Sequence, residues 1–314
     1  MNYLQFNDRG KFEPEEQALA TYFGEGNYIG FYKKHFLRDK FSITKDDFIS
    51  GDIDVMFHAM KRLGIEYSYN DYPEKLKPYL HRKIWEDELG NIRREIFAEG
   101  YLKNPIFIKP KDKLKRFTGF VLETIDDLAN CKGAGNQTKV WCSEPVTFVD
   151  EFRIYRLSYP DSALTTYSYG CHKKDFNSQN LEYVDTVVRD WPFSSELPVA
   201  CAIDVGVLST GEVALIEVND AFSLGLYKNV CPETEEGLSE YNELYCKCLI
   251  ARWDELKNVE HFALPSNAQL SLKIINCIKS HLCKQDEDYD KPTISPKFLS
   301  DTLDQMMIDG FEGA

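Results

Sequence analysis

The stretch AIDVGVLSTGEVALIEVND, residues 202–220, carries oxygen-bearing side chains inside an apolar pattern. Two runs of β-branched residues around a Gly-containing turn predict two strands of a hairpin. If the strands are symmetric about the Thr-Gly pair at 210–211, Asp204 lies opposite Glu217, and the members of a pair point to the same face. Asn219 joins that face because side chains alternate along a strand. The pattern therefore gathers two carboxylates and an amide at one place.

Two opposed carboxylates repel each other by up to about 1 kcal/mol, or more where water is scarce. Mg²⁺ would offset that repulsion, since it prefers oxygen ligands and accepts phosphates as co-ligands. The alternative is an ordinary solvated polar face of a half-buried sheet. The opposite face of the predicted hairpin is apolar, with Ile203, Val205, Val207, Ala214, Ile216 and Val218.

A second group of chemically suitable residues is basic. The predicted strand NPIFIKP, residues 104–110, ends with Lys109, from which an ammonium could reach a phosphate. The loop after it, residues 111–119, begins with Lys111 and contains two more lysines and an arginine. A donor-rich loop between strands can cover a polyphosphate, although a charge run is more commonly a solvated loop.

The length, composition and net charge of the chain limit the classes of protein to which it can belong. The chain has 314 residues with 43% hydrophobic content, enough for one large domain or two to three ordinary ones. The net charge of -14 argues against sequence-independent binding to nucleic acid or anionic membranes. The beginning of the sequence shows no secretory signal, and no apolar run reaches the ~20 residues of a membrane helix. We therefore expect a cytoplasmic protein whose nine cysteines are reduced.

The hydrophobic periodicity predicts the elements that position these residues. Residues 139–218 are expected to be rich in strands. A polar, proline-containing linker precedes a short terminal helix. The predicted helices are 54–65, 82–100, 234–257, 268–283 and 296–309, and the predicted strands outside the strand-rich region are 65–71, 104–110 and 120–124.

The order and spacing of four motifs resemble the ATP-grasp superfamily, over about residues 80–230. FIKP looks like the family's strand lysine, Lys109, and EFRIYRL like the strand that places Arg153 near phosphate or substrate. The hairpin looks like the family's metal-binding hairpin, with Asp204, Glu217 and Asn219 on its three ligand positions.

The segment SEPVTFVDE is similar to the family's linker that grips adenine and ribose, which puts Glu144, Thr147 and Glu151 on its contact positions. The upstream segment GIEYSYNDYPEKLKPYLHRKIW is similar to an uncharacterised ATP-grasp clade of bacterial and viral genomes. That likeness puts either Arg82 or Lys83 at the first basic nucleotide ligand.

The resemblance implies an α+β fold of two ATP-grasp lobes, preceded by a small α/β lobe and followed by a helical tail. The expected boundaries are 1–80 for the first lobe, 81–143 and 144–262 for the ATP-grasp lobes, and 263–314 for the tail. The chain departs from the amino-acid ligases in its basic rather than Gly/Ser-rich loop, and in having Asp220 where the family has Thr or Pro.

The resemblance also implies ATP and Mg²⁺ as cofactors and a ligase that joins a carboxylate to an amine through an acyl phosphate. Arg153, Arg189, His172 and Lys173 are candidates for substrate carboxylate or transition-state oxygens, although His172 alone is more simply an ordinary histidine. The expected substrate is a small molecule or peptide carrying a carboxylate. The alternatives are an ATP-binding assembly or regulatory factor that meets a protein partner through its helical tail, and a phosphotransferase on the same fold.

Overall fold

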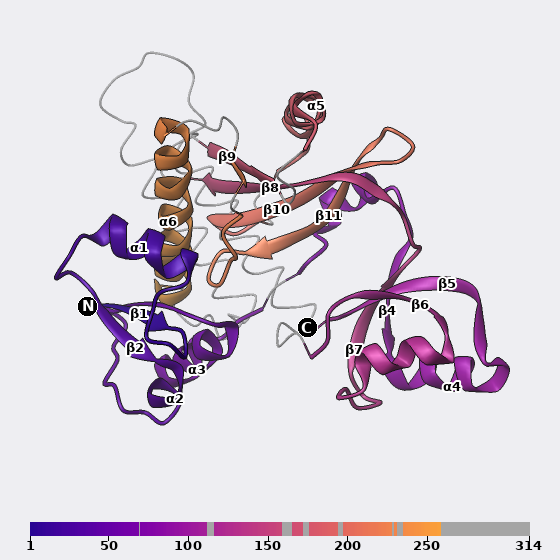
Figure 1. The fold of residues 1–314 in the computed structure, drawn as a ribbon, viewed down its shortest axis with the longest axis horizontal. Helices are drawn as coiled ribbons and strands as arrows, with labels where there is room; N and C mark the ends of the chain where they lie inside the picture. The colour runs from indigo at the N-terminus through magenta and orange to yellow at the C-terminus, as the bar shows by residue number, and fades with distance from the viewer. Residues whose placement is uncertain are drawn as a thin grey trace, which may run out of the picture. The chain divides into compact units, whose positions relative to one another are not determined.

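The computed structural model describes residues 1–258 apart from 69, 112–115, 159–164, 172–175, 194–196, 228 and 231–234. The predicted helices at 268–283 and 296–309, and with them the tail, lie outside the described residues. No helix within the described part of the chain is both long enough and apolar enough to cross a bilayer. The described residues fall into one unit, Met1–Asn258, built on three sheets (Figure 1).

The first sheet is parallel and has the strand order β2-β1-β3. Its strands are short and carry helices between them, as parallel pairing requires. The helix at residues 53–63 has the expected apolar spacing and ends at Gly64, whose φ of 66° is left-handed. The elements are β1 (Asn2–Phe6), α1 (Pro14–Phe23), β2 (Ile29–Tyr32), α2 (Lys33–Phe36), β3 (Phe48–Ser50) and α3 (Ile53–Leu63).

The second sheet is antiparallel, with the order β4-β7-β5-β6. The predicted helix 82–100 is wrong in its first part, because residues 84–88 form β4 and the helix begins at Leu89. The helical spacing of buried residues starts only there, with Leu89, Ile92 and Ile96. The elements are the 3-10 helix η1 (Glu74–Leu80), β4 (Ile84–Glu88), α4 (Leu89–Glu99), β5 (Tyr101–Pro110), β6 (Phe120–Thr124), the 3-10 helix η2 (Ile125–Cys131) and β7 (Lys139–Ser143).

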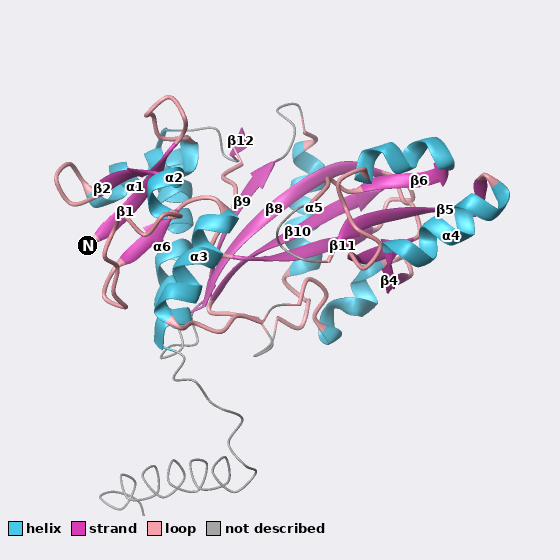
Figure 2. Ribbon diagram, turned by 90° about the horizontal axis from the view of Figure 1, so that it is seen from below, coloured by secondary structure: helices cyan, strands magenta, loops and turns pink. Residues whose placement is uncertain are grey.

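The third sheet has the order β11-β10-β8-β9-β12, and its long strands run side by side (Figure 2). Alternate residues of its central strands enter two different cores. Tyr155 and Ala202 pack with α6 and with the first sheet and its helices, whereas Ile154 and Ile203 pack with α5 and the segment around η1. The elements are β8 (Phe148–Ser158), β9 (Thr165–Cys171), α5 (Ser178–Val188), β10 (Ala200–Leu208), β11 (Val213–Asp220), β12 (Asn229–Val230) and α6 (Glu235–Asn258).

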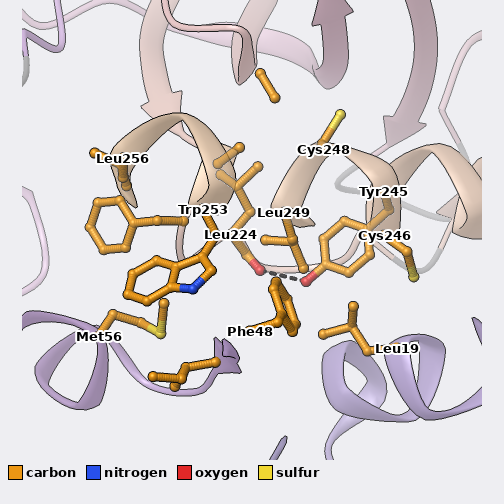
Figure 3. Close-up of a cluster of buried hydrophobic side chains, with 14 of the residues drawn as sticks. Leu19, Phe48, Met56, Leu224, Tyr245, Cys246, Cys248, Leu249, Trp253 and Leu256 are labelled. Atoms are coloured by element: carbon orange, nitrogen blue, oxygen red, sulfur yellow. Dashed lines mark hydrogen bonds between the residues drawn. The ribbon is translucent and has the colours of Figure 1, made fainter. Parts of the chain in front are cut away.

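Helix α6 supplies the apolar surface that the first lobe packs against (Figure 3). Trp253 is fully buried, and its indole N–H donates to the Asp47 carbonyl at 2.8 Å. Tyr245 donates its hydroxyl to the Leu224 carbonyl at 2.8 Å, which ties the loop after β11 to the helix. Because both polar groups have partners, these two large rings can be buried without leaving an unsatisfied donor.

The turn of the hairpin differs from the tight turn predicted from the sequence. Leu208 N–H donates to the Glu212 carbonyl, and Gly211 takes the positive φ, 92°, that closes a three-residue loop. Near the turn Val207 therefore pairs with Val213, and the register is one residue off the predicted one. A β-bulge at Ile216 corrects it, so that Asp204 does lie opposite Glu217 as predicted.

The bulge also changes which residues enter the core. Val213 and Leu215 pack with Ile203, Val205, Val207 and Val218, whereas the sequence placed Ala214 and Ile216 there. Ile216 is half-buried and Leu215 fully buried. The predicted strand at 65–71 is wrong too, since its described residues form no strand, and α5 was not predicted.

Leu215→Ala should therefore destabilise the fold more than Ile216→Ala. Deleting a fully buried leucine should lower the free energy of unfolding by about 2–5 kcal/mol, and the half-buried isoleucine should cost clearly less. Urea unfolding of both variants measures the difference. Equal costs, or the larger cost for Ile216→Ala, would contradict the bulge.

Candidate functional site

The two hairpin carboxylates face each other across β10 and β11. Asp204 is 6% exposed, and Asn219 bridges it to Glu217 through its amide nitrogen. Nδ2 of Asn219 lies 2.9 Å from Oδ2 of Asp204 and 3.1 Å from Oε1 of Glu217. The predicted grouping of these three side chains on one face is confirmed.

Arg153 neutralises the Asp204 carboxylate. Its Nε and Nη2 donate to both carboxylate oxygens at 2.8 and 2.7 Å, and its Nη1 donates to the Gly225 carbonyl at 3.1 Å. The guanidinium also lies 4.3 Å from the ring centroid of Tyr227. Arg153 was predicted to contact substrate, whereas its described contacts are with the hairpin and the loop that follows it.

Burial and pairing act in opposite directions on both members of this pair. Burial lowers the pKa of Arg153, but Asp204 outweighs burial and holds that pKa well above its usual value. Burial raises the pKa of Asp204, and Arg153 opposes that rise through its charge and its two hydrogen bonds. The ionised form of Asp204 therefore depends on Arg153.

Lys109 neutralises Glu217 from the other antiparallel sheet. At the end of β5 its ammonium donates to Glu217 and lies 3.4 Å from an oxygen of Asp71. It also sits 4.8 Å from the ring centroid of Tyr72. Burial lowers the pKa of Lys109, but Glu217, Tyr72 and Asp71 together raise it above the ordinary value. A lysine from one sheet thus meets a carboxylate of another sheet, Glu217, and a carboxylate of an irregular segment, Asp71.

The side chains of Arg82 and Lys83 have different surroundings, although the sequence alone did not decide which of the two would contact a nucleotide. The Arg82 guanidinium is directed at the backbone of β11, where it donates to the carbonyls of Leu215 and Ile216 at 2.7 and 3.0 Å. Lys83 is exposed, with its ammonium 5.5 Å from the ring centroid of Trp85. Lys83 is therefore the freer of the two to meet an incoming phosphate.

Lys111 lies beside a small polar cavity of about 310 Å³. Its ammonium pairs with Glu86 and lies 4.9 Å from the ring centroid of Trp141. Asp71 and Tyr72, which contact Lys109, line the same cavity. The cavity is thus lined by Lys111 and by two residues that contact Lys109.

The predicted adenine linker runs between β7 and β8. Glu144 binds back to the chain before β4, since its carboxylate accepts from the Lys83 N–H at 2.9 Å. The Thr147 carbonyl accepts from Ser209 N–H, at the hairpin loop, at 2.9 Å. Glu151 sits within β8, opposite Gly206 of β10. These contacts hold the linker against both sheets, and its nucleotide role stays a prediction.

The remaining candidates are not brought to the hairpin. Arg189 ends α5, is largely exposed and pairs with Asp185 one turn earlier at 2.9 Å. Lys173 and His172 lie outside the described residues.

Several residues of the site carry no sequence signal. Asp71 and Tyr72 come from an irregular segment, and Val218 N–H donates to the Asp71 carbonyl at 3.0 Å. Tyr155 donates its hydroxyl to the Gly225 carbonyl at 2.7 Å, beside Arg153. Only its alternation with Arg153 along β8 pointed to the same face.

The donor set defines what this arrangement can bind. Within the described part of the chain no group of three or more His, Cys, Asp or Glu side chains is arranged as a metal site. A cation at the hairpin would rely on two carboxylates and one amide. In the structure, Arg153 pairs with Asp204, and Lys109 pairs with Glu217.

Comparisons with known proteins identify the domain that contains this site. Residues 79–233 match a family described as an ATP-grasp domain, the second family of one ATP-grasp clade. No curated protein matches the chain in sequence.

Among solved structures, the chain is similar to D-alanine–D-alanine ligase from Bacillus anthracis, with 11% identity, a TM-score of 0.45, and coverage of 82% of this chain and 99% of that one. It is also similar to D-alanyl-alanine synthetase A from Vibrio cholerae, with 13% identity, a TM-score of 0.43, and coverage of 81% of this chain and 99% of that one. A third similar structure is that of N5-carboxyaminoimidazole synthetase from Staphylococcus aureus, with 9% identity, a TM-score of 0.41, and coverage of 81% of this chain and 77% of that one.

Removing Arg153 should leave Asp204 as an uncompensated buried charge. Arg153→Met should lower the free energy of unfolding by about 3–5 kcal/mol. The double variant Arg153→Met, Asp204→Leu should be less destabilised than the single one, because no unpaired charge is left at the position of Asp204. Arg189→Met, which breaks an exposed pair, is the control and should change little. Urea unfolding measures all three, and a double variant less stable than Arg153→Met would contradict this account.

Proposed function

Because residues 79–233 make this chain a member of the ATP-grasp superfamily, we propose that it is an ATP- and Mg²⁺-dependent ligase. The substrate would be a small molecule or peptide with a carboxylate, joined to an amine or similar nucleophile. The observation that carries the proposal is the ion pair of Lys109 with the hairpin carboxylate Glu217, which lies opposite Asp204. It unites phosphate-binding and metal-binding chemistry at one point.

The side chains present fit a divalent cation. Asp204 and Glu217 supply carboxylate oxygens, and the Asn219 amide already touches both of them. The nitrogen and oxygen of an amide exchange places when the group turns over, so Asn219 can offer either atom. Mg²⁺ held by these three residues would neutralise charge on the phosphates of ATP.

In the proposed reaction an oxygen of the substrate carboxylate attacks the γ-phosphorus of ATP. The bond from that phosphorus to the β–γ bridging oxygen breaks, and ADP leaves. The nitrogen of the amine then attacks the carbonyl carbon of the acyl phosphate and loses a proton. The carbon–oxygen bond to phosphate breaks, and inorganic phosphate leaves with its electron pair.

The protein's own contribution is positioning and charge compensation. Lys109 is positioned to exchange Glu217 and Asp71 for a phosphate oxygen. Lys83 and Lys111 are candidates to share that task, and Glu144, Thr147 and Glu151 would hold adenine and ribose. Arg153 favours the ionised form of the buried Asp204, so that its oxygens can act as ligands.

The nucleotide and the chemistry are tested together. ATP with Mg²⁺ should raise the melting temperature, because a ligand that binds only the native state stabilises it by mass action. GTP should do so less, given the linker. When pools of amino acids or peptides are then added, the protein should release ADP, and the amount released should depend on which pool is added. Nucleotide stabilisation without pool-dependent ADP would favour an ATP-binding factor, a phosphorylated product would favour a phosphotransferase, and no stabilisation by any nucleotide would refute the proposal.

Glu217→Gln separates the metal role from the fold. The substitution removes one of the carboxylates that compensate the half-buried Lys109, so the apo protein should lose about 1–3 kcal/mol of stability. Mg²⁺-dependent turnover should fall by about 100-fold or more, because charge stabilisation at the phosphates is lost. Glu243→Gln, which breaks an exposed pair with Lys247 on α6, is the matched control and should change neither quantity. Full turnover in Glu217→Gln would show that the carboxylate is structural.

A further inference from the structure

The bulge on β11 determines which residue opposes Asp204. With the three-residue loop, the register near the turn pairs Val207 with Val213 and Val205 with Leu215. Continued without interruption, that register would place Ile216 opposite Asp204. The bulge inserts Ile216 as an unpaired residue, and Glu217 takes the position opposite Asp204 instead. The meeting of the two carboxylates therefore depends on one irregular residue.

The bulge lies on an edge strand, and its outer side is covered by the chain before β4. In a regular strand, consecutive carbonyls point to opposite edges. Here the carbonyls of Leu215 and Ile216 both accept from one guanidinium, that of Arg82. The third contact of Arg82, to the Leu80 carbonyl at 3.0 Å, ties the guanidinium to the end of η1.

Arg82 is placed to hold this geometry by a planar, two-nitrogen contact. A guanidinium presents its donors in a fixed fork, which a lysine ammonium does not reproduce. The side chain also packs over the ring of Phe148, 5.7 Å from its centroid. A buried carbonyl without a donor costs free energy, so the bulge needs a donor at this position to persist.

We propose that Arg82 is a positioning residue whose guanidinium holds the β11 bulge and thereby turns the Glu217 carboxylate onto Asp204 and Asn219. The inference rests on the proposed function for its link to Mg²⁺, but the positioning itself is a property of the apo protein. It assigns Arg82 a backbone role in place of the nucleotide contact expected from the sequence, and it leaves that contact to Lys83.

Disulfide trapping tests the positioning without nucleotide or metal. Cysteines at the paired positions, D204C with E217C, should cross-link under mild oxidation because paired side chains face each other at short range. Adding R82Q should remove most of the cross-link, as measured by peptide mass spectrometry before and after reduction. Adding R93Q should not, although Arg93 also donates to a backbone carbonyl, that of Cys131.

Deleting Ile216 provides a rescue. Without that residue, the register near the turn already brings Glu217 opposite Asp204 in a regular ladder, so no bulge has to be held. The cross-link should therefore return when R82Q is combined with the deletion. Undiminished cross-linking in the R82Q background, or an equal loss with and without Ile216, would overturn the inference.

A second measurement uses the native carboxylates. The Mg²⁺ concentration that gives half of the ATP-dependent rise in melting temperature should increase about 10–100-fold in R82Q, as for residues that orient metal ligands, and not in R93Q. ATP binding in EDTA should be nearly unchanged. An equal loss of ATP binding with and without Mg²⁺ would show that Arg82 contacts the nucleotide and would overturn the inference.

The two measurements also separate the inference from the proposed function. A wild-type chain that ATP and Mg²⁺ do not stabilise would refute the proposed function, while the cross-linking result would still decide the role of Arg82. If R82Q does not fold, R82K carries the same comparison, since a single ammonium cannot hold two carbonyls in the spacing of the guanidinium and the cross-link should again fall.

Discussion

Two like charges placed opposite each other on neighbouring strands impose the main constraint on this protein. Asp204 and Glu217 can share one face only if cations balance them. The protein uses two cations from different elements, since Arg153 comes from the next strand of the same sheet and Lys109 from another sheet. Arg153 and Asp204 are both buried, whereas Lys109 and Glu217 are half-buried. The two cations thereby compensate the two carboxylates.

The ion pair of Lys109 with Glu217 couples the two antiparallel sheets electrostatically. Lys109 belongs to β5, whereas Asp71, its second carboxylate, belongs to the segment that covers the outer edge of β11. An anion that replaces Glu217 on Lys109 would release Glu217 to a cation. Nucleotide binding and metal binding would then be linked through one ammonium, which is a physical reason for the two to occur together.

The loop after the hairpin is held by contacts from several elements. The Gly225 carbonyl accepts from both Arg153 and Tyr155, and the Leu224 carbonyl accepts from Tyr245 of α6. From the first lobe, Glu15 of α1 accepts from Leu226 N–H at 2.9 Å. The residues that follow the hairpin are therefore fixed by the β8 strand, by α6 and by the first lobe at once. A substrate reaching Arg153 would meet a preorganised backbone.

The sequence by itself determined the strand pair, the polar face and the three oxygen-bearing residues on it, because alternation along strands is a local property. It also determined Lys109 at the end of a strand and the ATP-grasp resemblance. The pairing of Asp204 with Glu217 was predicted correctly from an incorrect turn, since the three-residue loop and the bulge shift the register in opposite senses.

Only the tertiary structure decided the rest. The bulge put Leu215 rather than Ile216 in the core. Arg82 is bound to two backbone carbonyls of β11, whereas its neighbour Lys83 is exposed. Arg153 went to Asp204, and an irregular segment brought its own carboxylate and ring to Lys109. These contacts join residues distant in sequence, and no period or propensity encodes them. They form because buried charges and carbonyls must find partners wherever the chain brings one.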